Sequence, residues 1–155
     1  MLCAFIADRE GKVTIMIRTF NELIKRPTFE ERFAYLLLGG KVGELTFGYD
    51  RWLNQNLYHS NKDWKKARRD AIIRDLGCDL ACKDHAIPDN VRIVVHHMNP
   101  ISKEDIIYGS DFLLNLDYLI TTIDATHQAI HYGDKSYIQR IQVIERSPND
   151  TCPWR

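Results

Sequence analysis

No apolar run in this chain approaches the roughly 18 residues that a helix needs to cross a lipid bilayer. The first residues, MLCAFIA, lack the basic start and the length of a secretory signal, and they lead directly into the charged segment Asp8-Arg9-Glu10. Both absences argue against a membrane-spanning or secreted protein. We therefore expect a cytoplasmic protein with no membrane partner.

A net charge is also absent, because 21 basic residues balance 21 acidic ones. Proteins that attract nucleic acid over their whole surface have a clear excess of positive charge, and this chain has none. Any binding to nucleic acid must therefore come from a local basic patch.

Cysteine is scarce, with four residues in the chain, and only Cys78 and Cys82 lie close together in the sequence. Such spacing gives no sign of a disulfide framework, so free thiols in a reducing cytosol are the expectation.

The length of 155 residues predicts a single domain, 1–155. Two apolar runs near the N-terminus, Leu2–Ala7 and Val13–Ile17, predict a hairpin around a polar turn. Thr28 and Glu31 have the spacing of a capping box, which predicts a helix that runs to about Leu38.

Four of the six histidines lie between Val91 and Gly133. The first two, His96 and His97, follow an apolar and β-branched run, Val91–Val95. Such a run predicts a short buried strand, and Asn99-Pro100 predicts its end.

The other two, His127 and His131, lie four residues apart in a segment that predicts a helix, with a cap-like start at Thr121-x-x-Asp124 and a stop at Gly133. Residues at this spacing share a helix face, with Cβ atoms about 6 Å apart, so both imidazoles can reach one cation. A histidine pair alone is weak evidence, because most histidines are packed or surface residues. The ordered set His-His, Asn115, His-x-x-x-His is far more specific.

The segments HHMNPI, NLDYLI and THQAIH resemble the HNH nuclease motif, which is also called the ββα-metal or His-Me finger. From about Thr19 onward the chain resembles small phage-encoded HNH endonuclease-like proteins, through LLLGGKVGELTFGYDRWLNQ, WKKARRDAIIRDLGCDL and the tail ERSPNDTCPWR. The resemblance implies an α+β fold: a ββα-metal core with flanking N-terminal helices and a small N-terminal hairpin. The segments would be a hairpin and helical part (1–60), a basic helix and loop (61–90), the HNH core (91–133) and a C-terminal extension (134–155).

The resemblance also implies a role for each motif residue. His96, His127 and His131 would bind one divalent metal ion, His97 would be the general base that activates water, and Asn115 would hold the loop that bears His97. Magnesium is the first expectation for the metal, with manganese, nickel or zinc as substitutes. Three imidazoles favour transition metals in raw affinity, however, so the metal stays open.

A helix from about Ser60 to Leu76 concentrates positive charge, with Trp64 on its inward stripe. Between positions 62 and 74 there are only two acidic residues but six basic ones. The basic residues are Lys62, Lys65, Lys66, Arg68, Arg69 and Arg74. A run of this kind is often only a solvated helix face. Beside a nuclease site we expect it to contact the phosphate backbone of DNA, with Arg92 as a weaker further candidate.

Many HNH proteins hold a structural zinc with two Cys-x-x-Cys pairs, and this chain departs from that pattern. Cys78 and Cys82 are spaced one residue too far, the second pair is missing, and His85 would supply only a third ligand where four are needed. We therefore expect no structural zinc, and one or two buried thiols instead.

Three functions follow from these expectations. The first is a metal-dependent HNH DNA endonuclease, with duplex DNA as its partner and a phage role in the host bacterial cytoplasm. The alternative is a catalytically silent or partner-dependent HNH-fold protein that binds DNA or phage packaging or replication proteins. The third is a structural zinc module built on His96, His127 and His131.

Overall fold

The computed structural model describes residues 5–7, 13–38, 51–82, 85–87 and 89–138 of the chain. Helices and short antiparallel strands are mixed in this part, which is consistent with the α+β class. The elements, with short 3₁₀ or π turns written η, are β1 (Phe5–Ala7), β2 (Val13–Ile15), α1 (Phe20–Ile24), α2 (Phe29–Leu36), α3 (Arg51–Asn54), η1 (Gln55–Ser60), α4 (Lys62–Arg74), β3 (Cys78–Asp79), η2 (Leu80–Cys82), β4 (His85–Ala86), β5 (Ile93–His97), α5 (Lys103–Tyr108), η3 (Asp111–Leu113), η4 (Leu116–Tyr118), β6 (Leu119–Ile123), α6 (Asp124–Tyr132) and η5 (Lys135–Tyr137).

Several sequence predictions are confirmed in detail. Strands β1 and β2 pair as an antiparallel hairpin. Helix α2 begins at a full capping box, in which the Thr28 side chain and the Glu31 side chain each bond the other's backbone N–H. Helix α6 ends at Gly133, which adopts φ +69. A residue with a side chain would be strained in that left-handed conformation, so the glycine fixes where the helix stops.

Three boundaries differ from prediction. Helix α4 is capped by Asn61 rather than Ser60, because the side-chain oxygen Oδ1 of Asn61 accepts from the backbone N–H groups of Asp63 and Trp64. The second strand of the His segment begins at Leu119, after a 3₁₀ turn over Leu116–Tyr118. Thr121 therefore lies inside β6 and does not cap α6.

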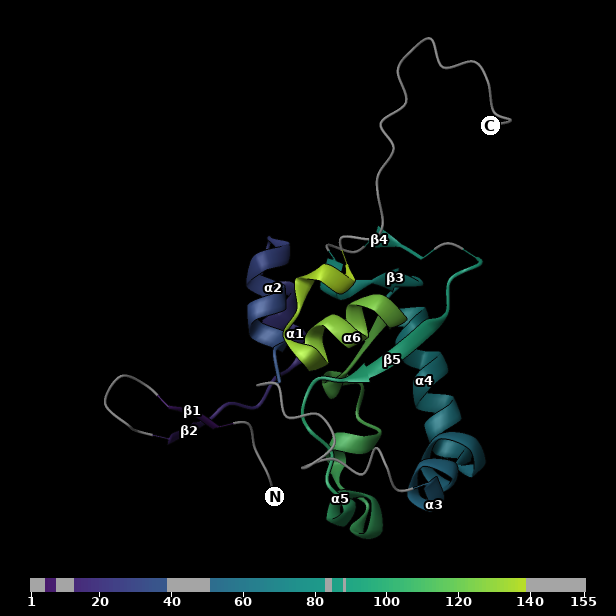
Figure 1. Cartoon of the computed structure of the whole chain (residues 1–155). Helices are drawn as coiled ribbons and strands as arrows, with labels where there is room; N and C mark the ends of the chain where they lie inside the picture. The colour runs from purple at the N-terminus through teal and green to yellow at the C-terminus, as the bar shows by residue number, and fades with distance from the viewer. Residues whose placement is uncertain (1–4, 8–12, 39–50, 83–84, 88, 139–155) are drawn as a thin grey trace.

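Strands β5 and β6 form the antiparallel pair on which the site is built, with helix α6 and helix α4 on either side of β5 (Figure 1). His96 lies opposite Ile120, and His97 lies opposite Leu119. Because side chains alternate along a strand, these two pairs point to opposite faces of the sheet. The α4 face of the sheet is therefore the face of His97, and the α6 face is that of His96.

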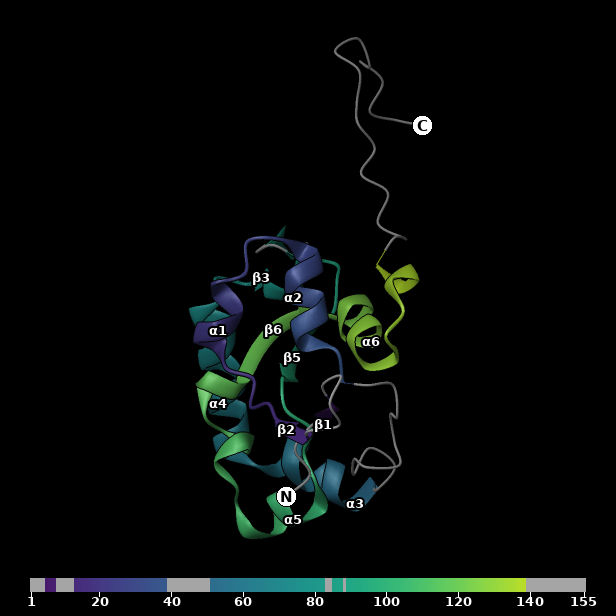
Figure 2. The same cartoon turned by 90° about the vertical axis from the view of Figure 1, so that its left-hand side faces the viewer.

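Each face of this small sheet packs against its own hydrophobic cluster. Ile120 belongs to a cluster formed with helices α1, α2 and α6, including Leu23, Leu36 and Ile130. Leu119 belongs to a second cluster, formed with α4 and the helical segment before it. Figure 2 shows α1 and α2 in front of the strands. Two apolar layers thus hold β5 and β6 between them.

Carboxylates cover the outer edge of β6. Asp75 Oδ2 accepts from the backbone N–H of Thr121 at 2.7 Å, and Asp79 Oδ2 accepts from that of Ile123 at 3.2 Å. An edge strand normally exposes unpaired backbone groups that can recruit another strand. Here the side chains of Asp75, the C-cap of α4, and Asp79, in β3, occupy two of these groups.

Within the residues that the structure describes, no helix combines the length and the apolar character that a bilayer crossing requires.

Candidate metal centre

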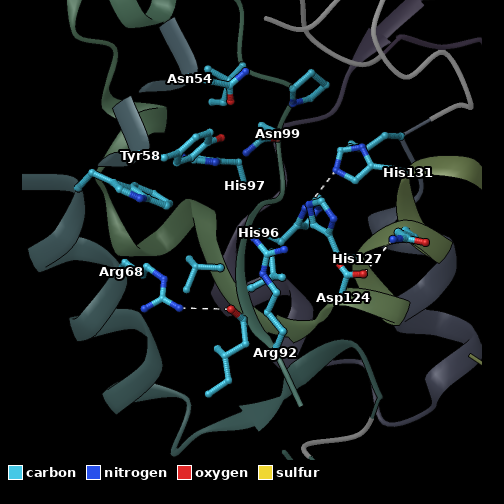
Figure 3. A pocket seen from close by; sticks show the side chains of 18 of the residues that line it. Asn54, Tyr58, Arg68, Arg92, His96, His97, Asn99, Asp124, His127 and His131 are labelled. Atoms are coloured by element: carbon cyan, nitrogen blue, oxygen red, sulfur yellow. Dashed lines mark hydrogen bonds between the residues drawn. The ribbon is translucent and has the colours of Figure 1, made fainter. Parts of the chain in front are cut away.

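The two predicted histidine pairs contribute three side chains to one cluster. His96 points from β5 toward α6, which presents His127 and His131 one turn apart (Figure 3). The ring of His96 lies 5.1 Å from each of the other two rings, centroid to centroid. One nitrogen of each imidazole lies within 4.8 Å of the others. The three residues predicted to bind metal are therefore brought together.

The geometry of these nitrogens fits a bound cation. His131 Nε2 lies 3.1 Å from His127 Nε2, which is within hydrogen-bonding distance. Two nitrogens that bind one tetrahedral zinc at about 2.0–2.1 Å are about 3.3 Å apart. The third nitrogen, His96 Nε2, is buried and has no hydrogen-bond partner. Such an orphaned polar atom costs roughly 1–3 kcal/mol, which a metal–nitrogen bond would offset.

All three imidazoles are held in the neutral form that binds metal. Burial lowers the pKa of His96 well below 6.5, and the neighbouring His127 and His131 lower it further. Burial also lowers the pKa of His127 to about 4 and lowers that of His131. At neutral pH each ring therefore keeps one nitrogen with a free lone pair, and no ring has to give up a net positive charge before a cation binds.

His97 lies on the opposite face of the sheet and is fixed by two contacts. Its ring stacks on Trp64 at 4.9 Å between centroids, and its Nε2 lies 3.1 Å from the carbonyl oxygen of Leu113. A carbonyl only accepts, so Nε2 has the proton and Nδ1 keeps its lone pair. Burial lowers the pKa of His97 to about 4, so this nitrogen is a proton acceptor at neutral pH, although a weaker base than an exposed histidine.

Asn115 does not contact His97, but it shapes the loop that does. Its side-chain amide donates to the Asp111 carboxylate at 2.9 Å, and its side-chain oxygen accepts from the backbone N–H of Asp117 at 3.0 Å. Between Asp111 and Asn115 lies Leu113, whose carbonyl accepts from His97. The structure therefore gives Asn115 an indirect part in positioning His97.

A cavity of about 880 Å³ connects the two faces at the end of β5. Its walls include the three-histidine cluster, His97, Trp64 and Tyr58. His59, which the sequence suggests is a surface residue, is exposed and also lines this cavity. A ligand in the cavity could thus reach the cluster and His97 together, which resolves the difficulty that adjacent strand residues point apart.

The basic residues of α4 divide by role. Arg74 turns inward: its guanidinium donates to the carbonyls of Leu116 and Leu119 and pairs with Asp75 at 2.7 Å. Arg74 therefore holds the start of β6 in place, and its guanidinium is not presented to a phosphate as predicted. Lys66 pairs with Asp70 at 2.6 Å, with Arg69 at 3.7 Å from the same carboxylate.

Arg68 and Arg92 both line the cavity, whereas Lys62 and Lys65 are exposed and do not line it. The Arg68 guanidinium donates to the carbonyl of Ile93 at 3.2 Å. The charge of Arg92 is one of the smaller causes that lower the pKa of His127. Of the seven predicted phosphate contacts, these two arginines are the ones that line the same cavity as the histidines.

Sequence reasoning missed the anchor that holds the end of β5. Asn99 Oδ1 accepts from the backbone N–H of Arg18 at 2.8 Å, and Asn99 Nδ2 donates to the Arg18 carbonyl at 2.9 Å. The Arg18 guanidinium is itself buried and bonds the carbonyls of Tyr35 and Leu37. No local pattern could reveal a contact between positions 81 residues apart.

The cysteine pair does not join a metal cluster in the described part of the chain. Cys78 and Cys82 are both free thiols, and the Cys82 sulfur lies 3.5 Å from the hydroxyl oxygen of Thr126. The side chain of His85 lies outside the described residues, so the expected lack of a structural zinc stays a prediction. Most of the C-terminal extension, from residue 139 to residue 155, also lies outside them.

Comparison of the chain with protein-family models, with curated proteins and with solved structures finds no match. The resemblance to HNH nucleases therefore depends on the motif residues and on the geometry described above.

Proposed function

We propose that this protein is a metal-dependent DNA endonuclease with a ββα-metal core formed by β5, β6 and α6. One observation supports this above all: the nitrogens of His96, His127 and His131 lie within 4.8 Å of one another, in a cavity that His97 also lines. A three-nitrogen metal site beside a separate, fixed imidazole would supply a Lewis acid and a base, which together can hydrolyse a phosphodiester by activated water.

In this proposal His97 is the general base. Its Nδ1 accepts a proton from the attacking water, while the Leu113 carbonyl and the Trp64 ring hold the imidazole in one tautomer and one orientation. The proton can leave through Nε2 only by breaking the bond to Leu113, so the ring must return the proton through Nδ1. Asn115 contributes by holding the loop of Leu113, and is a positioning residue rather than a catalytic one.

His96, His127 and His131 would hold the metal ion. When bound, a divalent cation supplies a Lewis acid for the phosphate and for the oxygen that leaves. Because all three donors are neutral nitrogens, the site favours zinc or nickel over magnesium and manganese, which prefer oxygen ligands.

Nicking of supercoiled plasmid tests this function. The wild-type protein should convert the plasmid to the open circle with manganese, nickel, zinc or magnesium, and should not do so with EDTA. His97→Ala should lose nicking yet still bind metal, because His97 is not one of the three nitrogen donors. Nicking at the wild-type rate by His97→Ala would overturn the assignment of the base.

A second candidate is a silent or partner-dependent protein of the same fold, which binds DNA or a phage packaging or replication protein. The burial of His97, which is 9% exposed and has a pKa lowered to about 4, favours it, because a weak base accelerates proton transfer less. This candidate predicts metal binding and salt-dependent DNA binding, with no nicking under any metal.

A further inference from the structure

Two arginines from different elements meet on one wall of the histidine cavity. Arg68 extends from α4 and is half-buried, with its guanidinium bonded to the carbonyl of Ile93 at 3.2 Å. Arg92 precedes Ile93 and is exposed. The bond to Ile93 therefore places the Arg68 guanidinium next to the backbone from which Arg92 extends (Figure 3). Among the described residues, Arg92 has no ion-pair or hydrogen-bond partner.

The charge of this wall is positive. The residues that line the cavity include two arginines and one carboxylate, Asp124, which accepts a hydrogen bond from Gln128 at 2.9 Å. The five histidines of the cavity add no negative charge, because an imidazole is either neutral or cationic. An anion is therefore the ligand that this cavity attracts, and a guanidinium can bind two phosphate oxygens at once.

The angular positions of Lys65 and Lys66 around α4 indicate on which flank of the helix the positive wall continues beyond Arg68. Lys65 lies three residues before Arg68, so it is about 60° away around α4, on the same flank. Lys66 is about 160° from Arg68, on the far flank, where it pairs with Asp70. Two adjacent lysines of the same helix thus face different surroundings.

We propose that Arg68 and Arg92, continued by Lys65, bind the phosphates of a nucleic-acid backbone beside the histidine cluster, and that Lys66, Arg69 and Arg74 do not. This assignment names how the substrate of the proposed function is held, and it divides a basic run that the sequence presents as uniform. Contacts of this kind set the position of the backbone without reading its sequence.

Fluorescence anisotropy with a fluorescein-labelled duplex and the matching single strand, in EDTA and over a series of salt concentrations, tests the proposal. Each phosphate contact contributes about 0.9 to the slope of log affinity against log salt for a duplex, and about 0.7 for a single strand. Arg92→Gln should lower the duplex slope by about 0.9, which is roughly a 3.5-fold smaller loss of affinity across a fourfold rise in salt. Lys66→Gln should leave the slope at the wild-type value.

A second pair of variants protects the test against misfolding. Lys65→Gln removes an exposed charge, and Arg68→Lys keeps a donor for Ile93 but loses the fork that binds phosphate. Both should weaken DNA binding while the melting temperature stays close to that of the wild type. Equal losses in Lys65→Gln and Lys66→Gln would show a diffuse electrostatic field and overturn the proposal, as would wild-type binding by Arg92→Gln.

Comparison of the duplex with the single strand distinguishes these two substrates. The one whose binding Arg92→Gln weakens more is the one whose backbone the wall fits. Because the measurement needs no cleavage, it separates this proposal from the nuclease assignment. Binding that depends on Arg92 without any nicking would leave the phosphate wall intact and remove the nuclease. Nicking by a protein whose DNA binding does not depend on Arg92 would support the nuclease assignment and overturn the phosphate wall.

Discussion

The imidazole of His97 lies almost parallel to the indole of Trp64, with the ring planes inclined by 20° and the centroids 4.9 Å apart. Tyr58 meets the same indole edge to face at 5.1 Å. Trp64 is 3% exposed, so the aromatic surface that orients His97 is part of the core of the α4 face. The stability of that core and the orientation of His97 are therefore linked.

We predict that Trp64→Leu lowers the nicking rate while metal affinity stays unchanged, because leucine fills the core but offers no ring for His97 to stack on. The unfolding free energy should fall by less than the roughly 3–5 kcal/mol expected for Trp64→Ala. Phe29→Leu is the matched control, since the ring of Phe29 packs at a tilt against that of Phe33 in α2 and does not line the cavity. A rate in Trp64→Leu equal to that in Phe29→Leu would show that the stack has no part in the chemistry.

Metal binding should stabilise the folded chain without being required for it. At a hundredfold excess over the dissociation constant, a cation that binds only the folded state adds about 2.7 kcal/mol, which raises the melting temperature by roughly 5–10 °C. His131→Ala should lose this rise, and His59→Ala should keep it, because His59 is not one of the three nitrogen donors. Thermal denaturation with and without zinc or nickel measures the rise in melting temperature for both variants.

The same experiment decides whether the cluster is a structural zinc module. The apolar clusters on both faces of β5 and β6 predict that EDTA-treated protein keeps its circular dichroism spectrum and unfolds cooperatively. Loss of the fold on chelation would favour the structural module over the nuclease.

Asp75→Ala should be strongly destabilising. Its carboxylate is fully buried, pairs with Arg74 and accepts from the backbone of Thr121, so its removal leaves a partly buried guanidinium and an orphaned β6 N–H. We expect a loss of about 3–5 kcal/mol in urea unfolding. Asp70→Ala, on the same segment, breaks only the exposed pair with Lys66 and should cost less than about 1 kcal/mol. Similar losses in the two variants would contradict a structural role for the Arg74–Asp75 pair.

Cys82 should make the folded state sensitive to alkaline pH. Burial raises the pKa of its thiol from 9.0 to about 11, and the charge of Asp79 adds to this effect. As pH rises above about 9 the thiol ionises first in the unfolded chain, which favours unfolding; the stability it contributes is therefore lost between pH 9 and 11. Urea denaturation across this range should show a shallower decline for Cys82→Ala than for the wild type or Cys78→Ala. Rapid alkylation of native Cys82 by iodoacetamide at pH 8 would contradict a buried, protonated thiol.

Short-range patterns in the sequence determined the local elements of the site. The spacing of Thr28 and Glu31 predicted the capping box, Gly133 predicted the end of α6, and the four-residue interval of His127 and His131 placed both imidazoles on one helix face. These features depend on neighbours within a single turn or strand, where backbone geometry leaves few alternatives. The order of His96, His97 and Asn115 likewise predicted which residues to examine together.

Only the tertiary structure decided what each of these side chains contacts. The basic run of α4 looks uniform in sequence, yet Arg74 turns into the fold, Lys66 pairs with Asp70, and Arg68 reaches the cavity. The Leu113 carbonyl that fixes the tautomer of His97, and the Asn99–Arg18 contact that holds the end of β5, join residues 16 and 81 positions apart. Burial lowers the pKa values of the histidines, and burial is a property of how the helices pack on the two faces of β5 and β6. Such contacts arise when separate elements meet, and no local pattern encodes which ones will.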